Sequence, residues 1–113
     1  MKFSEILKSV LASNKLTNET LRLSLVRQAR NVDSAQHRLV CALNELSTQI
    51  GKMNKNIPLF KVYDRGHIVR LASHVSDAEG EVREAVNMFW GTIEADDAFE
   101  DAFLAAFNVI HDG

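Results

Sequence analysis

The sequence predicts an all-α protein, an antiparallel helical bundle built on one long helical hairpin. Apolar residues recur every three or four positions over two long stretches, residues 17–50 and 64–93, which is the spacing of one helix face. The 113 residues include only one proline and five glycines. So few chain breakers favour helices over a β-sandwich, which needs a turn every few residues. The length fits a single helical-bundle domain over residues 1–113.

The first predicted element is a short amphipathic helix at the N-terminus. Its apolar residues follow the i, i+3, i+4, i+7 pattern of one helix face. They are Phe3, Ile6, Leu7, Val10 and Leu11. Ser4 is the expected N-cap of this helix. Residues 13–15 are its expected end, because Ser and Asn side chains hydrogen-bond to their own backbone.

The second predicted element is the long helix over about residues 17–50. Thr17 or Asn18 is its expected cap, and Gly51 is its expected stop. Its apolar face is interrupted only by Gln36. The residues that form this face are Leu21, Leu25, Ala29, Val32, Leu39, Leu43, Leu46 and Ile50.

Residues 57–63 are apolar without helical spacing, and we expect them to be extended or to form a strand with another subunit. Asp64 then caps a third helix to about residue 93, and residues 94–97 form an acidic turn before a medium C-terminal helix. Short connections make the two long helices antiparallel neighbours.

The two terminal helices are too short to cover both long helices, so we expect surplus apolar surface and a homo-oligomer. The candidate interface consists of aromatic residues and of two polar residues on apolar faces. These residues are Phe99, Phe103, Phe107, Trp90, Gln36 and Glu79. Gln36 and Glu79 have two interpretations. They either reach water at the edge of the core, or meet each other or their symmetry mates and fix helix register.

Charge divides unevenly along the chain. Residues 1–57 carry nine Lys/Arg against four Asp/Glu, a net +5, and residues 58–113 carry four against eleven, a net −7. An arginine stripe on the long helix is a candidate phosphate-binding surface, formed by Arg22, Arg27, Arg30 and Arg38. The pI of about 6.1 and the lack of a helix-turn-helix signature make nucleic acid the weaker alternative.

No pattern in the sequence predicts catalysis, a cofactor or a metal site. His67 and His74 are seven residues apart, about 10 Å along a helix, which is too far for one zinc ion. The single cysteine, Cys41, forms no internal disulfide and has no nucleophile motif around it. No apolar run has the length of a signal peptide or a membrane span, so we expect a cytoplasmic protein that does not act at a membrane.

The sequence therefore predicts a small non-enzymatic binding or regulatory protein of adaptor or inhibitor type. It acts on a protein partner that the sequence does not identify, and as a homo-oligomer. Two alternatives stay open. One is a nucleic-acid-associated regulator that uses the arginine stripe, and the other is a bundle that binds a small ligand near Trp90, Phe60 and Tyr63.

Overall fold

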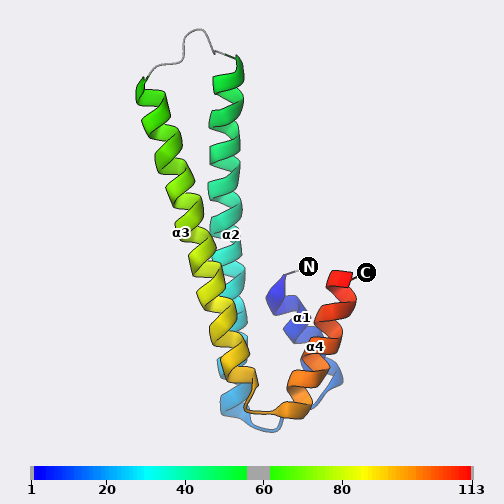
Figure 1. Ribbon diagram of the computed structural model, residues 1–113. Helices are drawn as coiled ribbons and strands as arrows, with labels where there is room; N and C mark the ends of the chain where they lie inside the picture. Colours follow the sequence, from blue (N-terminus) through cyan, green and yellow to red (C-terminus); the bar gives the residue numbers. More distant parts are fainter. Residues whose placement is uncertain (1, 56–61, 113) are drawn as a thin grey trace. The chain divides into compact units, whose positions relative to one another are not determined.

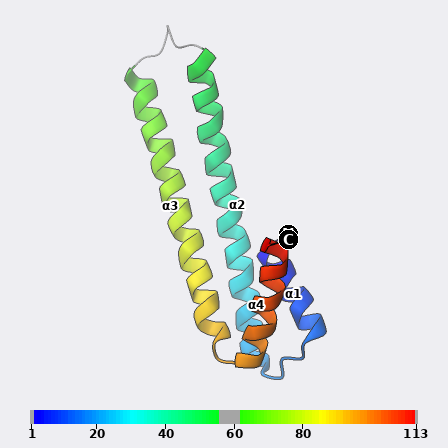
Figure 2. The same ribbon diagram turned by 45° about the vertical axis from the view of Figure 1, so that its right-hand side comes forward.

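The computed structural model describes residues 2–55 and 62–112, and within them it contains four α-helices and no strand. The helices are α1 (Phe3–Ser13), α2 (Glu19–Lys55), α3 (Val62–Ile93) and α4 (Asp97–Asp112), as Figure 1 shows. Helix α2 packs against α3, which confirms the all-α fold built on a long helical hairpin (Figures 1 and 2).

Two predicted boundaries of the hairpin helices are wrong. Helix α2 continues through Gly51 to Lys55, since Gly51 keeps an ordinary negative φ and costs a helix interior only about 1 kcal/mol. Helix α3 begins at Val62 rather than Asp64, so residues 62 and 63 are helical and not extended. Residues 57–61, the rest of the predicted extended segment, lie outside the described residues.

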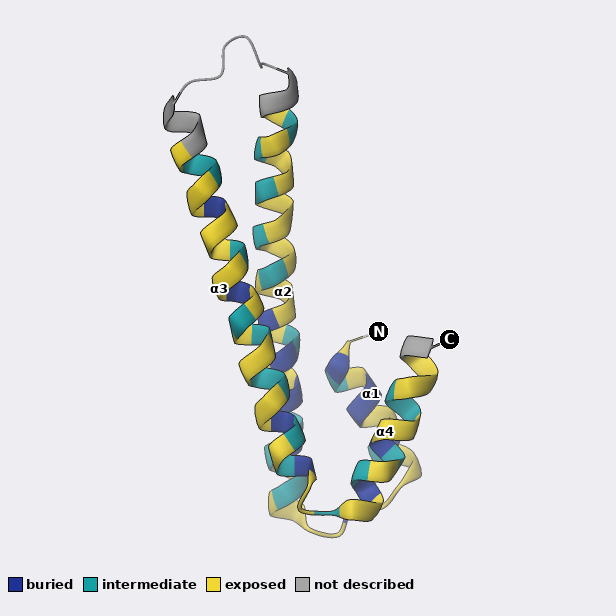
Figure 3. Cartoon of the chain, in the orientation of Figure 1, coloured by how far each residue is buried: buried dark blue, intermediate teal, exposed yellow. Residues whose placement is uncertain are grey.

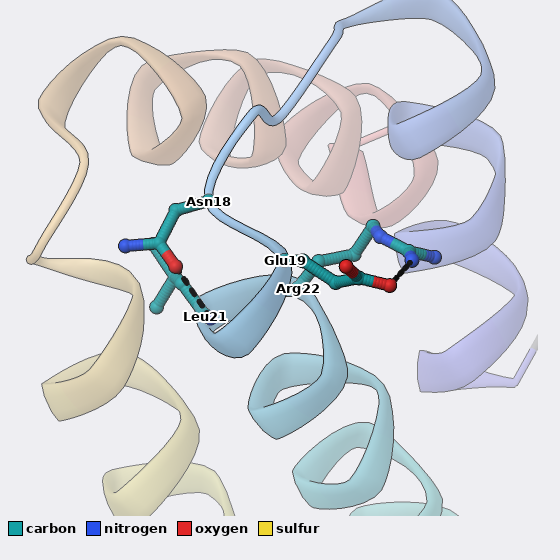
Figure 4. A network of polar contacts seen from close by, with 4 residues as sticks. All are labelled: Asn18, Glu19, Leu21 and Arg22. Carbon is teal, nitrogen blue, oxygen red and sulfur yellow. Dashed lines mark hydrogen bonds and ion pairs between the residues drawn. The ribbon is translucent and has the colours of Figure 1, made fainter.

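Local side-chain hydrogen bonds set several helix ends as the sequence predicts. Asn18 caps α2, because its Oδ1 accepts a bond from the backbone N–H of Leu21 at 3.1 Å (Figure 4). In the acidic turn, Asp96 caps α4 by accepting a bond from the backbone N–H of Phe99 at 3.0 Å. The end of α1 is confirmed as well, since the Asn14 side chain donates to the carbonyl of Val10 at 3.2 Å.

The predicted cap of α1 is wrong. Ser4 lies inside the first turn, and Lys2, which occupies the N-cap position, makes no side-chain cap bond. The capping group is Asp33, which lies 29 residues away on α2. Its carboxylate accepts a bond from the backbone N–H of Ser4 at 3.2 Å and another from the Ser4 hydroxyl. A carboxylate at this end also complements the positive end of the helix dipole.

The chain divides into two compact units. The four-helix unit comprises Met1–Ser34 and Arg83–Gly113, and the hairpin unit comprises Ala35–Val82. Helices α2 and α3 contribute residues to both units. That residues 1–113 form a single domain therefore stays a prediction.

The core of the four-helix unit contains large side chains from all four helices. Five aromatic rings gather in it: Phe3, Phe89, Trp90, Phe103 and Phe107. The Phe3 and Phe89 rings meet nearly edge to face, with centroids 4.7 Å apart, and the Phe89 and Phe103 centroids are 5.0 Å apart. Such aromatic pairs add about 0.5–1.5 kcal/mol each beyond the area they bury. This unit has a dense aromatic core.

The hairpin unit is held by a narrow seam of small and medium side chains (Figure 3). The seam residues are spaced alternately by three and four positions, which is the heptad spacing of a coiled coil. On α2 they are Ala35, Leu39, Ala42, Leu46 and Gln49, and on α3 they are Ile68, Leu71, Val75, Ala78 and Val82. Among these, only Ala35, Leu71 and Ala78 are fully buried. The seam thus buries little apolar surface.

Candidate functional site

An apolar stripe lies exposed on α2 within the hairpin unit. Val40 is 52% exposed, Leu43 46% and Ile50 42%. At about 100° per residue, these three side chains, Gln36 and Ser47 fall within about 80° of one another around the helix. We call these five residues the docking stripe. Single exposed apolar residues are ordinary, whereas several on one face make a candidate interaction surface.

The docking stripe exists because the apolar face of α2 is wider than one neighbouring helix covers. A single partner helix takes about two positions in every seven, whereas a face buried in a globular core takes three or more. The predicted inward positions Leu43 and Ile50 are accordingly exposed, and Ala42 and Gln49 face the seam in their place. The sequence correctly predicts surplus apolar surface, but places these two residues on the wrong side.

The candidate aromatic interface residues belong to the chain's own core. Phe99 and Phe103 are buried, and the rings of Trp90 and Phe107 are half-buried against Phe103. Helix α1 explains this packing, because its Phe3 lies among these rings. The phenylalanine face of α4 thus packs within the chain, whereas Leu104, Val109 and Ile110 on the same helix stay exposed.

The two candidate polar residues are both exposed, although the sequence places Gln36 in the seam. Ala35 takes the seam position next to it, and Gln36 lies on the docking stripe. Among the described residues, the buried polar side chain is that of Gln28, which is 9% exposed and whose Oε1 has no hydrogen-bond partner there. The heptad spacing of Leu25, Gln28, Val32 and Ala35 is the sequence signal that identifies it.

The four arginines of the predicted stripe occupy different environments. Arg38, in the hairpin unit, pairs with Glu81 of α3 at 2.8 Å. In the four-helix unit, Arg22 contacts Glu19 at 3.4 Å (Figure 4), and Arg22 and Arg30 line a pocket beside α1. Arg27 is exposed and does not line that pocket. These positions do not make one continuous row of equivalent phosphate contacts.

The remaining chemistry-bearing residues that the structure describes form no larger constellation. Cys41 Sγ lies 3.6 Å from His37 Nε2 one turn earlier, and both side chains are exposed. Across residues 2–55 and 62–112, no three His, Cys, Asp or Glu side chains gather in a way that would hold a metal ion. The predicted ligand site near Trp90 involves Phe60 and the Tyr63 side chain, which lie outside the described residues.

Within the described parts of the chain, none of the helices combines the length and the hydropathy that a membrane span requires. Comparisons with protein-family models, with curated protein sequences and with solved structures found no match to this chain.

Proposed function

We propose that this chain is a non-enzymatic, cytoplasmic binding protein that acts through protein–protein contact, first of all with a second copy of itself. The observation that supports this proposal is the docking stripe, where Val40, Leu43 and Ile50 stand about half exposed on one face of α2. Covering such a face removes apolar area from water at about 25 cal/mol per Å². Adaptors and inhibitors of this size use the same kind of surface to bind a protein partner.

A second hairpin is a suitable occupant, because the four-helix unit shows how this chain covers a wide apolar face. There, residues of α2 and α3 are buried by two further helices, α1 and α4. Two hairpin units that met along their docking stripes would likewise place further helices on α2. Gln36, as the polar residue of the stripe, would disfavour wrong registers, as a polar seam residue does in coiled coils.

The experiment is light scattering after size exclusion, at micromolar to millimolar concentrations of the full chain. We expect a dimer of about twice the 12.7 kDa chain mass. The double variant Leu43→Lys with Ile50→Lys should be a monomer with unchanged helical circular dichroism. The control is Leu23→Lys, which places one such lysine at an exposed leucine of α2 outside the stripe and should remain a dimer. A wild-type monomer at every concentration would contradict self-association.

The nucleic-acid alternative has a separate test. If the arginines contact phosphates, binding to mixed-sequence duplex should weaken with salt at a slope of about 0.9 per contact, and alanine at Arg27, Arg30 and Arg38 should abolish it. We expect no gel shift at low micromolar protein. A salt-sensitive shift that the triple variant lacks would favour a nucleic-acid partner over a protein partner.

A further inference from the structure

A pocket of about 630 Å³ lies between α1 and the first half of α2, within the four-helix unit. Small-molecule sites in proteins usually measure about 300–1,000 Å³. Apolar side chains of Leu7, Leu11 and Val26 line it. None of its lining residues belongs to the docking stripe, so its role is independent of the proposed self-association.

Two helix rows form the walls of this pocket. Arg22, Val26 and Arg30 follow one another at four-residue spacing on α2, and each step covers about 6 Å of helix. On α1, residues 4, 7, 8 and 11 form the facing row. The bonds between Ser4 and Asp33 hold the two helices together near one end of the rows. Both walls are therefore helical and joined by a side-chain contact, and regular elements hold a site more precisely than loops do.

The charges that line the pocket favour an anion. Three of the lining residues are cationic, namely Lys8, Arg22 and Arg30, against the single acid Glu5. Within the described part of the chain, neither Lys8 nor Arg30 makes an ion pair. Arg22 contacts Glu19 (Figure 4), but an exposed pair three residues apart on a helix contributes little and can be exchanged.

The register of the two helices brings two of these cations to the same level. Ser4 meets Asp33, and α1 runs antiparallel to the start of α2 (Figures 1 and 2). Lys8, four residues after Ser4, is therefore level with Arg30, three residues before Asp33. Leu11 and Val26 lie farther along the pocket, toward the α1–α2 connection. The pocket thus has Lys8 and Arg30 near the Ser4–Asp33 contact, then an apolar stretch, and Arg22 at its other end.

We infer that this pocket binds an aliphatic carboxylate of the medium-chain fatty-acid class. Its carboxylate is held by Arg30 and Lys8, and its chain lies over Leu7, Leu11 and Val26. The planar guanidinium of Arg30 suits a carboxylate, since it can donate two parallel hydrogen bonds. The Arg22–Glu19 pair lies near the methyl end of the bound aliphatic chain.

The test is isothermal titration of the full chain with hexanoate, octanoate, decanoate and decanol, each below its micelle concentration. We expect one carboxylate per chain, with an affinity that rises about fourfold per added methylene until the apolar part of the pocket is filled. Decanol should bind at least about tenfold more weakly than decanoate, because it has no charge for Arg30 and Lys8 to bind.

Variants at exposed positions separate the pocket from general surface charge. Lys8→Gln with Arg30→Gln should weaken decanoate at least about tenfold, and the matched Arg27→Gln, on the same helix outside the pocket, should change nothing. Unchanged circular dichroism would show that each variant folds. The inference is overturned if decanoate does not bind, if decanol binds equally well, or if Arg27→Gln weakens binding as much as the double variant.

Discussion

The four-helix unit and the hairpin unit use parts of the same two long helices, yet they bury different kinds of side chain. The first buries a cluster that includes Phe89 and Phe103, whereas among the described residues of the second only Ala35, Leu71 and Ala78 are buried. The apolar face of an amphipathic helix is fully buried when further helices cover both of its flanks, and only partly buried by one neighbouring helix. We therefore assign the stability of the fold to the four-helix unit, and we propose the hairpin unit as the surface for protein–protein contact.

The largest expected loss of stability is at the centre of the four-helix unit. Phe103 is fully buried, and Phe103→Ala should lower the free energy of unfolding by about 3–5 kcal/mol, through lost transfer free energy and the cavity left behind. Chemical denaturation measures this change. The neighbouring Leu104→Ala, at an exposed position, should stay within about 0.5 kcal/mol. Equal losses at the two positions would refute the assignment of stability to this core.

A smaller loss is expected at the carboxylate that caps α1 from α2. Asp33→Ala removes the acceptor of the Ser4 backbone N–H and hydroxyl, and should cost about 1–2 kcal/mol of stability. Asp77→Ala, at an exposed aspartate of the hairpin unit, is the control and should be nearly neutral. If thermal melting shows no difference between the two variants, Asp33 does not cap α1.

Substitution of Gln28, in contrast, should raise the stability of the fold. Its Oε1 is buried without a hydrogen-bond partner among the described residues, and leaving such a group unsatisfied costs about 1–3 kcal/mol. Gln28→Leu should therefore raise the melting temperature. Gln36→Leu, at the exposed glutamine, should change stability little and instead strengthen self-association. A destabilised Gln28→Leu variant would mean that the side chain makes a hydrogen bond that the fold needs.

The smallest expected loss of stability is at the surface of the hairpin unit. Arg38 and Glu81 pair at 2.8 Å, but both side chains are about half exposed. Such pairs contribute about 0–1 kcal/mol, so Arg38→Gln should lower stability by less than about 0.5 kcal/mol. High salt should reduce even this difference. A loss of several kcal/mol would show that the ion pair, and not the seam, holds the hairpin together.

Helix existence and helix order could be predicted from the sequence, because they depend on local periodicity and local caps. Asn18 and Asp96 illustrate this, since each bonds a backbone N–H three residues away. Gly51 shows the limit of local signals. A glycine that suits a helix end is also tolerated inside a helix, and its context within α2 decides between the two.

The details of packing could not be predicted, because they depend on which helices meet. Asp33 caps a helix that begins 30 residues earlier, and no local pattern joins the two positions. The width of apolar face on α2 allowed either Leu43 or Ala42 to face α3, and only the pairing with one helix selects Ala42. The pocket beside α1 likewise requires the register that the Ser4–Asp33 contact sets.

Hydrogen exchange along α2, measured on the dilute chain, tests the difference between the two units most directly. Backbone amides exchange through local opening, whose free energy is higher where more apolar surface is buried. We predict that amides of residues 25–34 exchange at least about tenfold more slowly than those of residues 39–50, although one continuous helix contains both. We also predict that raising the protein concentration protects residues 39–50. Uniform protection along α2, independent of concentration, would contradict both the division into two units and the docking role of the hairpin.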